Sequence, residues 1–170
     1  IIRRLGLLPG LTRKSVKNRI KTPGQHGKQI FTKTTRSSLS DDYKDRLLEK
    51  QKLRFNYGVT EKQLVAYYKQ AKRNKGATGN LLLEILESRL DCVVYRLGFA
   101  ATIPAARQLV NHGHIIVNNK LVNIPSFICN TGDTIAIRNK ESSKTLIGGN
   151  FETQQQKRTL IQRRMKRINL

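Results

Sequence analysis

The residues from Glu87 to about Arg138 constrain the fold most, because signals that end and start helices follow one another there at short spacing. Gly98 can end a first helix, since glycine accepts the left-handed backbone conformation found at many helix ends. Thr102 can cap a second helix through its hydroxyl, and Pro104 fits the first turn, where a missing N–H costs little. The second helix is expected to bury these residues of its apolar face: Ile103, Ala106, Leu109 and Val110.

A tight β-hairpin is predicted directly after the glycine that ends the second helix. Its strands are residues 114–117 and 120–123, and Asn118-Asn119 forms the turn between them. Asparagine tolerates the positive φ angles that a type I′ turn requires. Residues 135–137 then alternate as a short closing strand, so this stretch predicts one small α+β unit.

The net charge indicates the class of partner. The 170 residues include 33 Lys and Arg against 11 Asp and Glu, for a net charge of +22 and a pI near 10.7. Residues 1–80 carry 20 basic against 5 acidic side chains, residues 81–140 carry 6 against 4, and residues 141–170 carry 7 against 2. No apolar run approaches the roughly 20 residues of a membrane helix, and no single amphipathic anchor emerges. The charge therefore favours nucleic acid as the partner and argues against a membrane.

The first 40 residues show little hydrophobic periodicity and interleave basic residues with glycine and proline. They are either a solvated tail or an arm that orders only when RNA phosphates neutralise it. A helix is predicted from Ser40 to about Tyr57, and its buried stripe is expected to be Tyr43, Leu47, Leu48 and Phe55. A capping box over residues 60–63 predicts the start of the next helix.

Residues 81–90 are apolar almost all round, which predicts a buried helix, and the domain junction is placed there. The predicted fold is α+β, with a basic helical amino-terminal region followed by a small domain of two helices, a β-hairpin and a short sheet. The predicted domains are residues 1–85, residues 86–146 and a basic tail over residues 147–170, which is expected to be divergent or truncated. Because the chain begins at Ile1, residues are also expected to be missing at the front.

The sequence offers little for an enzyme. It holds no nucleophile motif and no glycine-rich loop with the spacing of an NTPase, so no catalytic residue, cofactor or small-molecule substrate is expected. Asp91 and Asp133 are interpreted as a helix cap and a turn residue. Cys92 and Cys129 are interpreted as buried free thiols, with a disulfide or shared metal site as the less favoured alternative.

Two histidines flank a glycine at the corner between the second helix and the hairpin. His112 and His114 could ligate zinc only with further Cys or His ligands, and none is near in sequence, so no metal is expected. Hydrogen bonding to a sugar-phosphate backbone is the favoured interpretation, and a structural role for one of the two is about equally plausible.

Several strings of the sequence carry a resemblance to a known family. ARQLVNHGHIIVNN, with RLD and RLGFA before it and VNIPS and GDTIAI after it, resembles the RNA-binding domain of the universal small-subunit ribosomal protein four. Similar domains occur in pseudouridine synthases and some tRNA synthetases. IRRLGLLPGLTRK, PGQHG, EKQKLRFNYG and KGATG resemble the amino-terminal region of that family in the same order, so the resemblance covers residues 1 to about 146.

The resemblance implies a structural protein of the small ribosomal subunit that binds the 5′ region of small-subunit rRNA directly. It further implies early binding that nucleates assembly of the body of the subunit, contact with small-subunit proteins five and twelve, and an effect on translational accuracy. Arg107 lies on the polar face of the second helix and is expected to contact RNA with little role in the core. The predicted RNA-binding residues are Arg3, Arg4, Arg13, Lys14, Gln25, His26, Lys28, Lys50, Lys52, Arg54, Lys72, Lys75, Arg89, Arg96, Arg107, Gln108, His112, His114, Asn118 and Lys120.

Two other functions stay open at this point. An RNA-modifying enzyme that uses the domain for targeting requires a catalytic domain, which residues 1–80 do not supply. A DNA-binding regulator would prefer duplex DNA over folded RNA. Motif details and the abundance of Lys, Ile and Asn resemble a plastid (chloroplast) version of the ribosomal protein, with the bacterial cytoplasm as the alternative.

Overall fold

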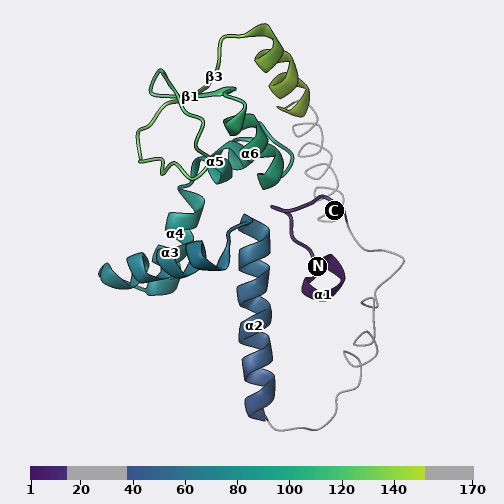
Figure 1. The fold of residues 1–170 in the computed structure, drawn as a ribbon, viewed down its shortest axis with the longest axis vertical. Coiled ribbons are helices and arrows are strands. Elements are labelled where there is room, and N and C mark those ends of the chain that lie inside the picture. Colours follow the sequence, from purple (N-terminus) through teal and green to yellow (C-terminus); the bar gives the residue numbers. More distant parts are fainter. Residues whose placement is uncertain (15–37, 152–170) are drawn as a thin grey trace, which may run out of the picture. The chain divides into compact units, whose positions relative to one another are not determined.

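The computed structural model describes residues 1–14 and 38–151 (Figure 1). The chain divides between Leu64 and Val65 into a first and a second unit. Within the described ranges, no helix combines the length and the apolar character that crossing a membrane requires.

The first unit contains α1 (Ile2–Leu5), the long helix α2 (Ser38–Tyr57) and the start of α3 (Glu61–Arg73). The structure begins α2 at Ser38, two residues before the predicted start, a difference within the usual uncertainty of helix ends. Its buried apolar residues come mainly from the ends of elements and from loops: Leu5, Leu8, Tyr57, Val59 and Leu64.

The predicted buried stripe of α2 is wrong for Tyr43 and Leu47, whereas Leu48 and Phe55 are half-buried. Tyr43 is 68% exposed and Leu47 is 36% exposed, and Tyr57 is the buried residue among the described side chains of this helix. An apolar stripe is buried only where another element covers it, and no described element covers this part of α2.

The predicted capping box at the start of α3 is confirmed. The Thr60 backbone N–H donates to Gln63 Oε1 over 3.0 Å, and the Gln63 backbone N–H donates to Thr60 Oγ1 over 3.4 Å. Two backbone donors that the helix leaves unpaired are therefore satisfied reciprocally.

The second unit continues α3 and adds α4 (Thr78–Glu87), α5 (Leu90–Leu97) and α6 (Ile103–Asn111). A three-stranded antiparallel sheet follows, formed by β1 (Ile115–Val117), β2 (Lys120–Leu121) and β3 (Ile135–Ile137) in the order β2-β1-β3. A further helix runs over residues 141–151. Together these elements confirm the predicted α+β fold class.

The local signals read from the sequence in this unit are confirmed. Gly98 ends α5 with φ 89°, and the Thr102 hydroxyl accepts a hydrogen bond from the Ala105 backbone N–H over 3.4 Å at the start of α6. Asn118 and Asn119 have φ angles of 49° and 62°, as a type I′ turn requires, and they connect β1 to β2.

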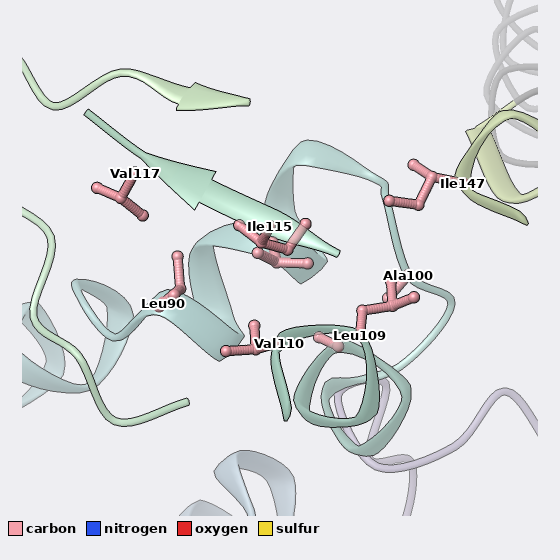
Figure 2. Close-up of a cluster of buried hydrophobic side chains, with 9 residues drawn as sticks. Leu90, Ala100, Leu109, Val110, Ile115, Val117 and Ile147 are labelled. Atoms are coloured by element: carbon pink, nitrogen blue, oxygen red, sulfur yellow. The ribbon is translucent and has the colours of Figure 1, made fainter. Parts of the chain in front are cut away.

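A cluster of buried apolar side chains fills the space between α5, α6 and β1 (Figure 2). The predicted face of α6 is buried through Ile103, Ala106, Leu109 and Val110. Ile147, from the helix over residues 141–151, also joins the cluster, although it is the first residue of the segment predicted as a tail (Figure 2). The apolar core of the second unit therefore draws on residues from Leu90 to Ile147.

The helix predicted over residues 81–90 is less buried than expected. Leu86 is the one fully buried residue of α4, and Leu83 on the same helix is exposed. The structure also interrupts this segment, because α4 ends at Glu87 and α5 begins at Leu90.

Candidate nucleic-acid interface

The basic side chains of the first unit lie on its surface. Arg3 and Arg4 are exposed on α1, and Arg13 and Lys14 are exposed after it. The predicted residues Gln25, His26 and Lys28 lie outside the described residues.

On α2, three cations lie beside carboxylates. Lys52 Nζ lies 2.6 Å from Glu49 Oε1, Lys50 Nζ pairs with Glu61 Oε1, and Arg54 Nη1 lies 3.6 Å from Glu61 Oε2. The hydrogen bond from Lys50, with its positive charge and that of Arg54, lowers the pKa of Glu61 below its ordinary value of 4.5. Exposed ion pairs of this kind contribute little to stability. A phosphate can therefore compete with these carboxylates for the same cations.

In the second unit, the carboxyl end of α3 presents cations without partners. Lys72 and Lys75 are exposed and form no ion pair with any residue that the structure describes. Lys69 and Arg73 are exposed beside them. Cations at a helix carboxyl end also interact favourably with the helix dipole, so this position alone does not require a ligand.

Arg96 lies near the end of α5 and is well exposed. Its Nε donates to Glu87 Oε2 over 2.8 Å, its Nη2 bonds the other oxygen of the same carboxylate, and its guanidinium lies over the Tyr95 ring. The side chain is 63% exposed, so this bidentate pair holds the guanidinium in one place at the surface.

The two histidines at the corner after α6 have different surroundings. His112 is exposed, as is Gln108 on α6. His114 Nδ1 shares a hydrogen bond of 2.8 Å with Ser143 Oγ, and Ser143 is fully buried. A structural role for one of the pair therefore fits His114, which connects β1 to the helix over residues 141–151.

A buried ion-pair network occupies the space between α5 and α6. Asp91 is fully buried, and its two carboxylate oxygens accept hydrogen bonds from Arg89 Nε over 3.1 Å and Arg89 Nη2 over 2.9 Å. Arg107 Nε donates to Asp91 Oδ2 over 2.7 Å, and Arg89 Nη1 donates to the Tyr67 hydroxyl over 2.6 Å. The carboxylate of Asp91 thereby connects α5 to α6, and Arg89 extends the network to Tyr67 on α3.

This network corrects three expectations. Asp91 does not cap a helix; it lies inside the first turn of α5 and pairs with two guanidinium groups. Arg89 is 2% exposed, so its guanidinium faces the protein and leaves no surface for a phosphate. Arg107 has a structural contact that its place on the polar face of α6 did not indicate, although 29% of its side chain is exposed.

The charge of Arg89 is maintained in this buried setting. Burial by itself lowers the pKa of a guanidinium, but the hydrogen bonds and negative charge of Asp91, with a smaller contribution from Tyr67, outweigh it and raise the pKa of Arg89. Among the described residues, no buried side-chain nitrogen or oxygen lacks a hydrogen-bond partner. The network is thus fully satisfied.

The hairpin turn is braced by side chains. Asn118 Nδ2 donates to Asp133 Oδ1 over 2.8 Å, and the Thr134 backbone N–H donates to Asn118 Oδ1 over 2.9 Å. The bond from Asn118, with the one from the Asn130 backbone N–H, lowers the pKa of Asp133, which is confirmed as a turn residue. Lys120 is exposed at the start of β2. In this turn Asn118 supports the backbone, and Lys120 is the side chain available to a ligand.

The cysteines are free thiols, as expected. Cys92 is buried and Cys129 is half-buried. Burial, with the nearby charge of Asp133, raises the pKa of Cys129 to about 11, and burial with the neighbouring Asp91 raises that of Cys92 further. No group of three or more potential metal ligands occurs within residues 1–14 and 38–151.

Sequence reasoning missed two members of the hydrogen-bond networks described above. Tyr67 and Ser143 gave no signal, because each acts on a partner at least 22 residues away. Basic residues that are exposed in the second unit but were not predicted are Lys69, Arg73, Arg138, Lys140 and Lys144. The spacing of Lys69 and Arg73, four residues apart on one helix face, was the signal that could have added that pair.

Comparison with known proteins adds independent findings. Residues 1–87 match the family described as "Ribosomal protein S4/S9 N-terminal domain", and residues 88–135 match the "S4 domain". "Small ribosomal subunit protein uS4c" of Cyanophora paradoxa is 57% identical over 151 residues, 89% of this chain and 72% of that protein. The uS4c protein of Rhodomonas salina is 60% identical over 147 residues, 86% of this chain and 69% of that protein. "Small ribosomal subunit protein uS4" of the Rippkaea orientalis strain is 57% identical over 152 residues, 89% and 71% of the two chains.

Proposed function

Because the chain belongs to the small ribosomal subunit protein uS4 family, we propose that it binds small-subunit rRNA directly and nucleates assembly of the body of the subunit. It is a ribosomal protein of the plastid or bacterial type and not an enzyme. The alternative of an RNA-modifying enzyme is thereby set aside.

The observation that carries the proposal is the exposed positive charge on both units. Binding would occur through phosphates, since lysine and arginine neutralise them and release counterions, with shape recognition by the rigid helices α5 and α6. The residues proposed to contact RNA are Arg3, Arg4, Arg13, Lys14, Lys50, Lys52, Arg54, Lys72, Lys75, Arg96, Arg107, Gln108, His112 and Lys120.

Three residues that the sequence predicts to bind RNA have supporting roles in this proposal. Arg89 is buried against Asp91, His114 bonds Ser143, and Asn118 braces the hairpin turn. Each positions a neighbouring element, and none is proposed as a direct phosphate contact.

The proposed division of the chain follows the charge. Residues 1–85 would form a basic rRNA-binding region with an extended arm, residues 86–146 a small RNA-binding domain, and residues 147–170 a basic tail. The first region would neutralise RNA strands that converge at the binding site. Bringing such strands together early is the physical basis proposed for nucleating assembly.

Contacts with small-subunit proteins five and twelve, and through them an effect on translational accuracy, complete the proposal. The support is the family membership. A chain that lies on rRNA beside those proteins would influence decoding through their shared contacts and not through chemistry of its own.

A salt titration tests the proposal. The affinity for a small-subunit rRNA transcript should fall steeply with salt, with a slope of about −0.7 to −0.9 for each phosphate neutralised. A duplex DNA of equal length tests the regulator alternative and should bind more weakly. An affinity that barely changes with salt, or a preference for the DNA, would contradict the proposal.

A charge variant sharpens the same experiment. Replacing both Lys72 and Lys75 by Gln should reduce the slope by about 1.4 to 1.8 without changing the melting temperature, because both side chains are exposed. Lys144→Gln is the matched control, since Lys144 is an exposed lysine of the same unit outside the proposed contacts. It should leave the slope nearly unchanged.

A further inference from the structure

Asp91 is a fully buried acid in a chain whose partner is a polyanion, and it contacts an arginine of the proposed interface. We infer that Asp91 is a positioning residue for RNA binding: it holds the partly exposed guanidinium of Arg107 in the orientation in which a phosphate meets it. The inference rests on the proposed function and adds to it a residue that does not touch the RNA.

The carboxylate itself is held rigidly. Arg89 forms a bidentate pair with Asp91: its Nε donates to Oδ1 and its Nη2 donates to Oδ2. The Cys92 backbone N–H also donates to Oδ1, over 2.9 Å. Such bidentate geometry fixes the plane of a carboxylate as well as its place. The Tyr67 hydroxyl accepts from Arg89 Nη1, so α3 restrains the far side of the same guanidinium.

Arg107 contacts this fixed carboxylate through its Nε. Its Nε donates to Asp91 Oδ2 over 2.7 Å, and the side chain keeps 29% of its surface exposed. A free arginine side chain samples many rotamers, and a phosphate that binds it must restrict them at a cost in affinity. Because Asp91 restricts Arg107 before RNA arrives, part of that cost falls on folding instead of binding.

A purely electrostatic account of Asp91 makes the opposite prediction. A carboxylate near an RNA surface repels phosphate, so its removal would strengthen binding or leave it unchanged. In the positioning account, removal weakens binding even though the net charge of the protein becomes more positive. The sign of the change therefore separates the two accounts.

The test compares the rRNA affinities of full-length variants. Asp91→Asn should weaken binding by about three- to tenfold, since it loses the charged acceptor that orients Arg107. Glu84→Gln is the matched control: Glu84 is an exposed acid of the same unit, and its replacement changes the net charge equally. Affinity for the transcript should be unchanged or slightly increased in this control.

A double-mutant cycle links the effect to Arg107. Arg107→Gln alone should weaken binding by about tenfold. When Asp91→Asn is already present, the same change should weaken binding by less than about threefold, because an arginine that is no longer oriented contributes less to the affinity. Equal effects in both backgrounds would overturn the inference, as would an Asp91→Asn protein that binds as tightly as the Glu84→Gln control.

Arg107→Lys keeps the inference testable if Asp91→Asn fails to fold. Lysine retains the charge but has no Nε donor, so it cannot form the bond to Asp91 that restricts the arginine side chain. The lysine variant should melt as a folded protein and bind rRNA several-fold more weakly; full affinity would overturn the inference. Failure of the proposed function would look different from failure of this inference. In that case the unaltered chain itself would show no salt-dependent rRNA binding.

Discussion

The two units differ in how much apolar surface they bury and in how much charge they expose. The second unit buries apolar residues from α5, α6, β1 and the helix over residues 141–151 around one cluster. The first unit has α2, whose exposed surface includes Tyr43 and Leu47, and whose cations are matched by carboxylates at its surface. One unit is stabilised mainly by burial, whereas the other exposes much of the amino-terminal half of a long helix.

This difference indicates how the two units respond to a polyanion. Burial of apolar surface stabilises a fold without a ligand, at about 25 cal/mol per Å². Exposed ion pairs stabilise little by themselves, but they exchange readily for phosphates. Residues 1–64 carry 16 Lys and Arg against 5 Asp and Glu. We therefore expect the order of the first unit, which has the thinner core, to depend more on RNA than that of the second.

Separating the units should have the largest effect. A fragment of residues 65–151 retains the whole apolar cluster and should unfold cooperatively, whereas its affinity for small-subunit rRNA should fall by about a hundredfold or more, because many phosphate contacts are removed. Circular dichroism and filter binding would measure both. If this fragment bound rRNA as tightly as the whole chain, the basic first unit would contribute nothing to binding, and the comparison would fail.

A matched pair of truncations comes next. Ile147→Ala removes a fully buried side chain from the cluster and should lower the free energy of unfolding by about 2–5 kcal/mol. Leu47→Ala on α2 removes an exposed side chain and should change it by less than about 0.5 kcal/mol. Denaturant titrations followed by circular dichroism give both values. A similar loss for the two variants would show that α2 has a covered face.

Helix capping offers a smaller test in both units. Thr102→Ala removes the cap of α6 and should cost about 1 kcal/mol, seen as a lower melting temperature of the second unit. Gln63→Ala breaks the capping box of α3 at similar cost, but its main effect should be faster amide hydrogen exchange in the first turn of that helix. Equal protection of these amides with and without Gln63 would contradict the role of the box.

The smallest effect concerns acidification. The pKa of Glu61 is lowered in the folded protein, so its pairing contributes stability above the pKa of the unfolded chain and loses it as the pH falls through the folded value, below 4.5. Glu61→Gln should remove this part of the pH dependence and leave stability at neutral pH almost unaltered. Carboxyl NMR titration of Glu61 checks the direction; a pKa above 4.5 would contradict it.

Local signals in the sequence predicted much of the second unit. The glycine after α5, the threonine before α6 and the paired asparagines of the hairpin act within a few residues, so the sequence alone contains their physical reason. The alternation in residues 135–137 also indicated the closing strand correctly.

Contacts over longer distances could not be read in this way. The ion pair of Asp91 with Arg107 spans 16 residues, and each member has an ordinary local explanation, as a cap or as a polar-face residue. The apolar stripe of α2 predicted burial, but a stripe does not say whether another element covers it. Pairing and covering are properties of the tertiary fold.

The burial of Ile147 has a consequence for the order of events during translation of this chain. The ribosome has synthesised all the other residues of the cluster once it has added Val117, but it adds Ile147 only 30 residues later. At about 5–20 residues per second, Ile147 is added roughly 1.5–6 s after Val117. During that interval the part of the cluster that Ile147 will cover is exposed to chaperones and to other nascent chains.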